Sequence, residues 1–281
     1  MEPCPTVSYE RPDCKTLSSE GYQCVDMHFH TEFSDCFTSV QSALKLAKER
    51  SVGLAITDHN IIKGSETAIE LSEDVMIVPG IELNSWDGPH ILAYFYDFPS
   101  LRSFWERHVK DNVTKNPWKF LRITSDHLVD LLEKEQCVVS AAHPFGCGIF
   151  YQGLEKAIRK GLSKESVRDR VDAYEVLNSC MSQEFNAKAR DIAKDRGLCM
   201  TGGTDSHYLS NLGTGLTVSK ADSVDSFLDN IKKKRNSVMG VSCSKGGVYR
   251  TGAICTVSEL IRFPSSFHSS MEHKLHMHDY D

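Results

Sequence analysis

Short apolar runs along this chain end, one after another, in histidine or carboxylate residues. The ionisable residues at these ends form five clusters: His28 and His30 with Asp35; His59; Glu82 with His90; His143; and Asp205 with His207. Strands of one sheet can deliver such side chains to a common edge, where they assemble a multinuclear metal site. The pattern therefore predicts a barrel-like α/β enzyme with metal ligands at its strand ends.

Strand-like runs alternate with helical patterns over most of the chain. Seven runs have the apolar or alternating character of strands: residues 24–30, 53–57, 75–78, 90–96, 137–142, 171–176 and 198–201. Apolar residues at helical spacing occupy residues 38–50, 65–71, 125–136 and 184–196. Alternation of this kind is typical of parallel β/α architecture.

The domain organisation follows from these patterns. Residues 1–23 are polar and proline-rich and are expected to form an extended arm, whereas residues 24–241 form the barrel domain. Within that domain, the charged and aromatic residues 97–136 predict a helical cap. Residues 242–281 form a C-terminal extension, and its histidine-rich end, residues 267–281, is expected to be disordered or to bind metal adventitiously.

Composition limits the classes of partner. The net charge is −6, with 38 acidic and 32 basic residues, so we expect no binding to duplex nucleic acid. No apolar run approaches the ~20 residues that span a bilayer, and the N-terminus lacks a signal pattern. We therefore expect a cytoplasmic protein with no membrane contact.

The ten cysteines are scattered and form no Cys-x-x-Cys pair, which argues against a structural zinc site. Cys36 and Cys147 lie within a few residues of the proposed ligands. Both fit small residues near a pocket, and both also fit reactive thiols, because reactivity depends on surroundings that a sequence does not show.

Two of the clusters illustrate why these residue types suit a metal. His28 and His30 lie on the same face of a strand, because side chains alternate, and Asp35 can fold back from the following turn. The next apolar run ends in Thr57, Asp58 and His59, which are costly to bury unless they are paired or metal-bound.

Thr57 and Asp58 are candidates to orient the His59 ring. Each cluster alone is also compatible with an ordinary surface loop. Five of them at strand ends in one chain favour a common site.

The motifs resemble those of the polymerase and histidinol phosphatase (PHP) family of metal-dependent phosphoesterases. The matching motifs are His28-x-His30, Ser34-Asp35, Thr57-Asp58-His59-Asn60, Gly80-Ile81-Glu82, His90-Ile91-Leu92, His143-Pro144 and Gly203-Thr204-Asp205-Ser206-His207. The resemblance implies a distorted (β/α)7 barrel, here with a short helical insertion, and three divalent ions of zinc, manganese or iron. By position, the three ligand sets would be His28, His30, Glu82 and Asp205; Glu82, His90 and His143; and Asp35, His59 and His207, with Glu82 as the bridge.

Such a centre would generate a bridging hydroxide that attacks a phosphate ester. Asp205, Glu82 and His207 are the candidate catalytic residues, and Asp205 or a water would return a proton to the leaving oxygen. Candidate substrate contacts, each of which also fits a turn or a solvated side chain, are Lys63, Asn84, Ser85, Asn178 and Ser206.

The sequence therefore predicts a metal-dependent phosphoesterase acting on a small phosphorylated metabolite, with nucleoside mono- or bisphosphates favoured. A cyclic phosphodiesterase, a histidinol-phosphate-type phosphatase, a nuclease on short single strands and a non-catalytic metal-binding protein are the alternatives. Only 52 residues separate His90 from His143, and no arginine directly follows Pro144, which weakens the nuclease alternative. The oligomeric state is left open.

Overall fold

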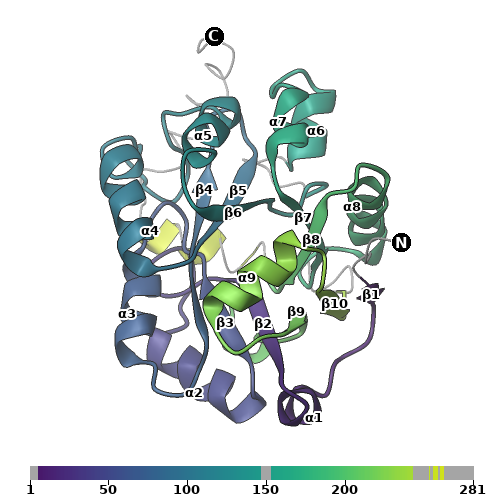
Figure 1. Ribbon diagram of the computed structural model, residues 1–281. Helices are drawn as coiled ribbons and strands as arrows, with labels where there is room; N and C mark the ends of the chain where they lie inside the picture. Colours follow the sequence, from purple (N-terminus) through teal and green to yellow (C-terminus); the bar gives the residue numbers. More distant parts are fainter. Residues whose placement is uncertain (1–5, 147–152, 243–252, 254–255, 259, 263–281) are drawn as a thin grey trace.

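A mixed β-sheet forms the centre of the molecule and helices surround it (Figure 1). The computed structural model describes residues 6–146, 153–242, 253, 256–258 and 260–262. Its strands are β1 (Thr6–Ser8), β2 (Tyr22–Phe29), β3 (Gly53–Ile56), β4 (Ile77–Asn84), β5 (His90–Phe95), β6 (Cys137–Ala141), β7 (Ala173–Asn178), β8 (Cys199–Gly203), β9 (Gly215–Lys220) and β10 (Ser237–Gly240).

The helices cover the sheet and form its connections. They are α1 (Cys14–Ser19), α2 (Val40–Arg50), α3 (Lys63–Leu71), α4 (Phe98–Phe104), α5 (Ser125–Leu132), α6 (Leu154–Arg159), α7 (Ser166–Arg170), α8 (Gln183–Asp195) and α9 (Val224–Lys232), with a π-helical turn η1 (Trp105–Val109) and a 3-10 turn η2 (Leu209–Asn211). Hydroxyl or carboxylate side chains cap several of them. Ser39, for example, accepts a hydrogen bond from the backbone N–H of Ser42 at the start of α2.

The strand order is β1-β10-β9-β2-β3-β4-β5-β6-β7-β8. β2, β3 and β4 run parallel, as do β6, β7 and β8, whereas β5 is antiparallel to both of its neighbours. The sheet curls until the ends of β2 and β8 meet, where Asp205 donates its N–H to the carbonyl of His28 at 2.7 Å and Phe29 forms a parallel bridge with Ser206.

The α/β class and the curled sheet agree with the sequence, but a regular (β/α)7 repeat is not confirmed. Ten strands are present among the described residues, and their directions are mixed. The antiparallel direction of β5 has a local cause, because only residues 85–89 separate β4 from β5, too few for a helical crossover.

The interior of the curled sheet is apolar. Met27, Leu92, Tyr94 and other inward residues of the strands pack against one face of α9, which contributes Phe227, Leu228 and Ile231. This face is buried because α9 is amphipathic, and a capping box of Ser223 and Ser226 starts the helix. The core thus holds the strands at a fixed spacing below the ends that carry the candidate ligands.

One segment differs from the sequence expectation. Residues 6–23 are not simply an extended arm, because β1 pairs with β10 and α1 packs beside β2. Pairing with a strand more than two hundred residues away leaves no local pattern in the sequence. Segment 97–136 is helical as expected at α4, η1 and α5, with a loop between them.

Two expectations concern residues outside the described part of the chain, namely Cys147 and the histidine-rich residues 267–281. Within the described part, none of the helices combines the length and the apolar character needed to cross a bilayer.

Tyr94 provides a test of the interior packing. Its buried hydroxyl donates to the carbonyl of Met27 at 2.7 Å, which ties β5 to β2 across the interior. We expect Tyr94→Phe to lower the free energy of unfolding by about 1–3 kcal/mol, because a buried acceptor loses its partner. Denaturant titration measures this change. Tyr96→Phe is the matched control, since its hydroxyl bonds the exposed Asp229, and equal losses in both variants would contradict the assigned role.

Candidate metal centre

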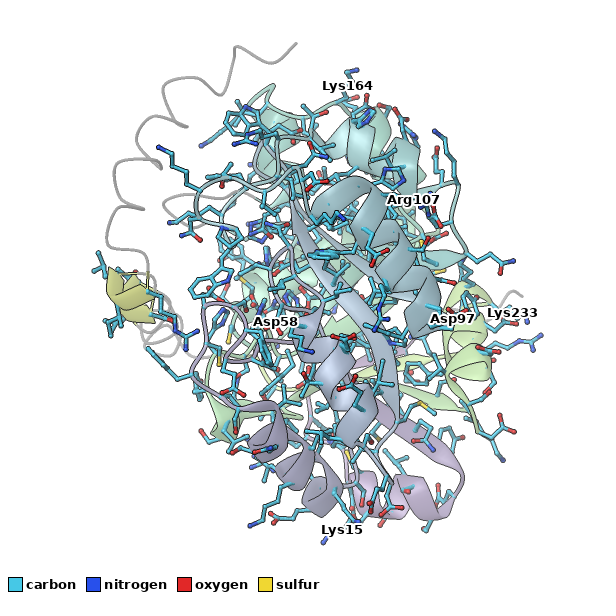
Figure 2. All side chains as sticks on the ribbon, turned by 90° about the vertical axis from the view of Figure 1, so that its left-hand side faces the viewer. Lys15, Asp58, Asp97, Arg107, Lys164 and Lys233 are labelled. Carbon is cyan, nitrogen blue, oxygen red and sulfur yellow. The ribbon has the colours of Figure 1, made fainter. Side chains whose placement is uncertain are left out.

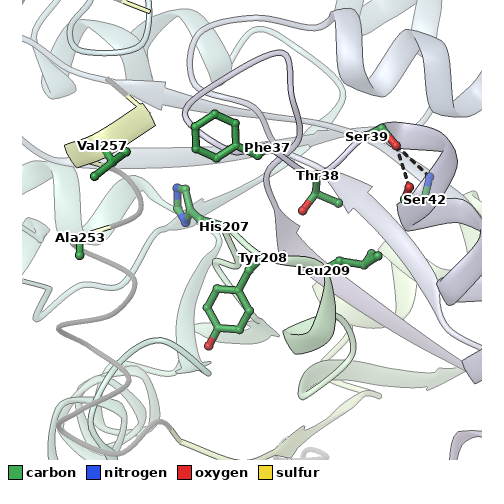
Figure 3. A pocket seen from close by; sticks show the side chains of 9 residues that line it. All are labelled: Phe37, Thr38, Ser39, Ser42, His207, Tyr208, Leu209, Ala253 and Val257. Carbon is green, nitrogen blue, oxygen red and sulfur yellow. Dashed lines mark hydrogen bonds between the residues drawn. The ribbon is translucent and has the colours of Figure 1, made fainter. Parts of the chain in front are cut away.

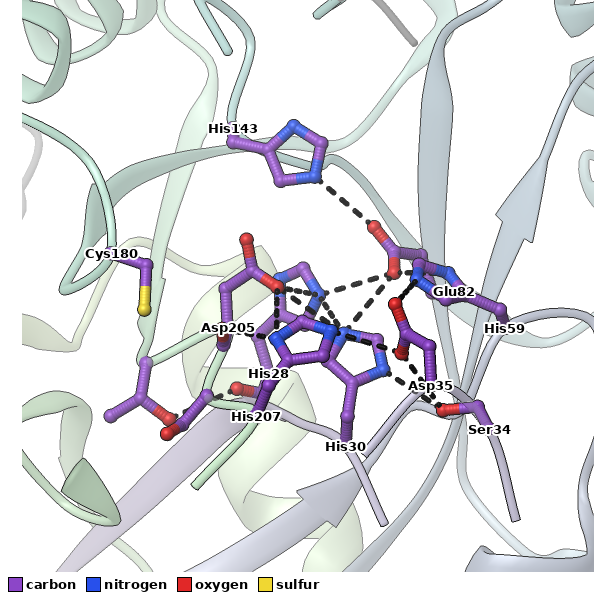
Figure 4. Close-up of polar contacts among 12 residues, drawn as sticks. His28, His30, Ser34, Asp35, His59, Glu82, His143, Cys180, Asp205 and His207 are labelled. Carbon is purple, nitrogen blue, oxygen red and sulfur yellow. Dashed lines mark hydrogen bonds and ion pairs between the residues drawn. The ribbon is translucent and has the colours of Figure 1, made fainter. Parts of the chain in front are cut away.

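The nine predicted ligands come together at one end of the curled sheet, and Figure 4 labels all of them except His90. His28 lies in β2 and His30 directly after it, so that their Nε2 atoms are 3.1 Å apart. Asp205 and His207 follow β8, which meets β2 at this edge. All nine side chains are buried.

The antiparallel β5 explains why His90 opens a strand while the other ligands end one. In the β4–β5 register, His90 lies opposite Asn84, the last residue of β4. The start of β5 therefore reaches the same edge as the end of β4. His90 Nδ1 then contacts Glu82 Oε1 at 3.0 Å.

Glu82 is the centre of the cluster, and its carboxylate is surrounded by imidazole nitrogens. Oε2 lies 2.8 Å from His59 Nδ1, 3.3 Å from His28 Nε2 and 3.4 Å from His30 Nε2, and Oε1 lies 3.0 Å from His90 Nδ1 and 3.2 Å from His143 Nε2. A carboxylate with both oxygens shared in this way is suited to bridge two cations.

A second group of contacts lies around Asp35 and Asp205. Asp35 Oδ1 is 2.9 Å from His207 Nε2, and Asp35 Oδ2 is 3.5 Å from His59 Nε2. Asp205 Oδ1 is 3.3 Å from His30 Nε2 and 3.5 Å from His28 Nε2. The two aspartates thus face the cluster from different strand ends.

Three sets of ligand atoms are close enough to hold an ion each. They are His30, Asp35, His59 and His207; His28, His30 and Asp205; and His59, Glu82 and His90. Within each set the ligand atoms lie within 4.8 Å of one another. His30 and His59 are shared between sets, and His143 joins the cluster through Glu82.

The residues fit divalent metal ions. Glu82 Oε2 is buried and accepts no hydrogen bond from the described residues, although three imidazoles surround it. A buried carboxylate oxygen without a hydrogen bond is costly unless a cation compensates it. Imidazole nitrogen and carboxylate oxygen are the donor types that zinc, manganese and iron accept. Metal binding therefore accounts for an oxygen that protein contacts leave unsatisfied.

The carboxylate of Glu82 and two of the imidazoles are in the forms that bind a cation, whereas neighbouring carboxylates, against the effect of burial, raise the pKa of His28, His59 and His143. Burial alone would raise the pKa of Glu82, but His28, His59 and His90 hold it well below its usual range, so the carboxylate is ionised. Burial, together with the neighbouring His207 and His59, lowers the pKa of His30 to about 4. Burial also lowers the pKa of His90 to about 4, although Glu82 opposes the shift. Both of these rings are therefore neutral at pH 7 and offer lone pairs.

Glu175 contacts the candidate ligands, and the sequence analysis missed it. From β7, its Oε1 accepts from His28 Nδ1 at 3.0 Å, and its Oε2 accepts the backbone N–H of His143 at 2.7 Å. The first bond places the proton of His28 on Nδ1 and leaves Nε2 as the ligand atom. An acidic residue inside the apolar run 171–176 was the available signal.

Two predicted substrate contacts lie against the ligands. Asn178 Nδ2 donates to Glu175 Oε2 at 2.9 Å and to Asp205 Oδ2 at 3.2 Å. Asn84 Oδ1 contacts His59 Nδ1 at 3.1 Å, and its Nδ2 donates to the carbonyl of Trp118. Both amides are buried and orient the ligands.

The other predicted substrate contacts lie elsewhere around the site. Lys63 is exposed at the start of α3, where its amine pairs with Glu66 at 2.9 Å. Ser85 donates to the carbonyl of Pro89, and Ser206 donates to that of Tyr208. Substrate binding by these residues stays a prediction.

Asp58 supports the site from behind. Asp58 accepts from the backbone N–H and the hydroxyl of Thr31 and from the hydroxyl of Ser34, so it holds the loop that leads to Asp35. Thr57 is fully buried beside it in the chain. Figure 2 shows Asp58 inside the protein, whereas Lys15, Lys164 and Lys233 lie at its edge.

The backbone is unusual at three points of the site. Asn60, His143 and Asp205 adopt positive φ angles of 56°, 27° and 50°. Such conformations are rare for residues other than glycine and persist where surrounding contacts enforce them. For Asp205 the enforcing contact is the hydrogen bond of its N–H to His28. Cys36, by contrast, is an ordinary buried residue, and burial raises the pKa of its thiol.

The bridging position of Glu82 leads to a test by metal content. We expect Glu82→Gln to weaken metal binding by more than about tenfold, because a neutral amide cannot balance two cations. Elemental analysis after dialysis against a weak chelator measures the ions per chain. Glu70→Gln, which removes an exposed carboxylate from α3, should leave the metal content unchanged. Full occupancy in Glu82→Gln would contradict the bridging position.

The contact between Glu175 and His28 leads to a separate test. We expect Glu175→Gln to lower metal affinity about 10- to 100-fold. Glutamine has one neutral acceptor oxygen, so its side chain cannot accept hydrogen bonds from both the His28 ring and the backbone N–H of His143. Calorimetric titration of the metal-free protein measures the affinity. An unchanged dissociation constant, with the fold intact by circular dichroism, would show that Glu175 does not orient the ligand.

Comparisons with known proteins agree with the sequence motifs. The PHP-associated family model (PHP_C) matches residues 183–236, which include Asp205 and His207. A search of curated proteins found no match. Solved structures share the fold at low identity.

Endonuclease Q, in complex with a 27-mer duplex carrying an abasic lesion, is 16% identical with a TM-score of 0.61. The match covers 79% of this chain and 60% of that one. The lesion-specific endonuclease from Pyrococcus furiosus, also 16% identical with a TM-score of 0.61, matches over 77% of this chain and 57% of its own. This chain therefore spans about three fifths of the length of these endonucleases.

A third similar structure is a two-domain protein from Bacteroides vulgatus ATCC 8482 that contains a predicted PHP-like metal-dependent phosphoesterase. It is 15% identical with a TM-score of 0.56, and the match covers 88% of this chain and 72% of that one.

One expectation is corrected by these findings. We expected a small phosphorylated substrate and no duplex nucleic acid, but a protein of this fold is known with duplex DNA bound at its active site. Net charge misled the prediction, because an average over the whole chain says little about the surface around one site. The family-model match and the shared fold together confirm the resemblance of this chain to the PHP family.

Proposed function

We propose that this protein is a metal-dependent phosphoesterase that hydrolyses phosphodiester bonds of nucleic acid. The observation that carries the proposal is the buried cluster of nine ligands around Glu82. The choice of substrate is supported by the similarity of the fold to Endonuclease Q. The proposal returns to the nuclease alternative of the sequence analysis and extends it from short single strands to other nucleic acids. The cytoplasmic location expected from the sequence is part of the same proposal.

Three ions of zinc, manganese or iron are proposed, one for each set of ligand atoms. His28, His30 and Asp205 would hold the first; Glu82 and His90, with His59 or His143, the second; and Asp35, His59 and His207 the third. Glu82 would join the sets, since its two oxygens face different imidazoles. Such ions lower the pKa of water and neutralise the charge of phosphoryl oxygens.

The substrate is proposed to approach from the side of Asp35, His59 and Asp205. These side chains are 8%, 10% and 9% exposed, whereas those of His28, His30 and Glu82 are fully buried. The deeper ligands therefore exclude water from behind the cluster. The more exposed ones border the position where a phosphate ester can enter.

Asp205 is proposed to move the proton in this reaction. Its Oδ2 accepts from Asn178, which leaves Oδ1 directed at the cluster near His28 and His30. Oδ1 can take a proton from the attacking water and return it to the leaving oxygen. The fixed backbone at Asp205 keeps the carboxylate in this orientation.

The proposal is tested by removing and restoring metals. The chelator-treated protein should lose hydrolysis of single-stranded DNA, duplex DNA and an abasic duplex, and manganese or zinc should restore it. Asp205→Asn should lower kcat about 10²- to 10⁴-fold, because it removes both the proton acceptor and a proposed ligand of the first ion. Gel assays of labelled oligonucleotides measure the rates.

The control for the substitution is Asp225→Asn, an exposed carboxylate on the first turn of α9, which should keep full activity. A metal-loaded wild-type protein that cleaves none of these substrates would overturn the proposal and favour a protein that binds metal without catalysis. Full activity of Asp205→Asn would refute only the role given to that residue.

A further inference from the structure

A cavity of about 680 Å³ that is largely open to solvent lies directly beside the metal centre (Figure 3). His207 belongs both to the cluster of ligands and to the wall of this cavity. The remaining wall is largely apolar and includes Phe37, Tyr208, Leu209 and Val257. A volume of this size is in the range of cavities that bind small organic groups.

Two aromatic residues of the wall are close to metal ligands in the chain. Phe37 follows Asp35 by two residues, and Tyr208 directly follows His207. Asp35 and His207 contact each other at 2.9 Å. The rings of Phe37 and Tyr208 are therefore attached to backbone next to the same proposed ion position. In Figure 3 the Phe37 and Tyr208 rings lie on opposite sides of the His207 imidazole.

Phe37 is exposed to an unusual degree for its type. Its side chain is 52% exposed, whereas most large apolar residues of the described chain are buried. A single exposed apolar residue is common on protein surfaces, but this ring also lines the cavity beside His207. Its open surface therefore suits contact with a ligand.

The ring is held in place from another side by Arg262. The guanidinium carbon lies 5.1 Å from the centroid of the Phe37 ring. The same group donates to the carbonyls of Glu32, Ser34 and Cys36, at 2.7, 2.9 and 3.2 Å. Arg262 thus fixes the loop that carries both Asp35 and Phe37. A ring fixed before binding loses little freedom when a ligand stacks on it.

The far end of the cavity is polar. Thr38, Ser39 and Ser42 border it at the start of α2, and the hydroxyls of Ser39 and Ser42 are 2.8 Å apart. A ligand that fills this cavity therefore needs a flat apolar face and a polar edge. A nucleobase has both.

We propose that this cavity binds the nucleobase of a nucleotide adjacent to the scissile phosphate, with Phe37 as the stacking surface. The inference rests on the proposed function, because the phosphate of that nucleotide has to lie at the metal centre. Stacking on an aromatic ring tolerates every base, so Phe37 increases affinity without selecting a sequence. The site consequently distinguishes a nucleotide that bears a base from an abasic one at this position.

The direct test uses 2-aminopurine, whose fluorescence is quenched when the base stacks. Dinucleotides with a slowly hydrolysed phosphorothioate linkage, and with 2-aminopurine on either side of it, are titrated with the metal-loaded protein. We expect quenching for one of the two positions and loss of that quenching in Phe37→Ala. Phe37→Tyr, which keeps a ring, should restore it. Leu71→Ala, another exposed apolar residue on α3, should behave as wild type.

A kinetic test measures the preference for a nucleotide that bears a base over an abasic one. The wild-type protein should show a lower KM for a dinucleotide with a base than for one with a tetrahydrofuran abasic analogue at the same position. In Phe37→Ala the KM for the base-bearing substrate should rise about 5- to 150-fold, so that the preference disappears. Metal content, measured in parallel, should match wild type.

The outcomes separate the two proposals. Hydrolysis of oligonucleotides without quenching, or with the same preference in Phe37→Ala, would overturn the base-binding cavity and leave the proposed function intact. Quenching that depends on Phe37, without hydrolysis of any oligonucleotide, would support the cavity and overturn the proposed function. Absence of both would refute both.

Discussion

The carboxylate of Glu82 is the constraint on which the rest of the site depends. It is fully buried and ionised, and five imidazoles lie within 3.4 Å of its oxygens. Burying a charge in a protein interior is costly unless other charges compensate it. The surrounding strands must therefore hold histidines, and the ions that we propose, close to this one side chain. The curled sheet meets that requirement by directing its strand ends toward Glu82.

The mixed direction of the sheet has a functional consequence. Because β5 runs antiparallel to β4, His90 at its start lies at the same edge as the end of β4. A parallel strand would have carried its first residue to the opposite end of the sheet. The departure from a regular β/α repeat thus adds a ligand to the site. Glu175 has a similar structural importance, since one carboxylate orients His28 and holds the backbone at His143.

The ligands were predictable from the sequence because their signal is local. An apolar run that ends in His59 or Glu82 is visible within a few residues, as is the alternation that pairs His28 with His30. Glu175 was harder to recognise, because it lies inside a strand and its role depends on residues of β2 and of the loop after β6. The pairing of β1 with β10 and the contacts of Arg262 join segments more than two hundred residues apart. Such pairs leave no periodic pattern.

The sequence by itself determined which side chains can bind metal and that they follow strands, because side-chain alternation and the cost of burying polar groups act over a few residues. Only the tertiary structure decided how the ligands group around Glu82, that β5 reverses direction, and that Phe37 is exposed beside His207. These features arise from the closure of the sheet between β2 and β8 and from long-range contacts of the C-terminal segment. They depend on distances in space that no local pattern of residues records.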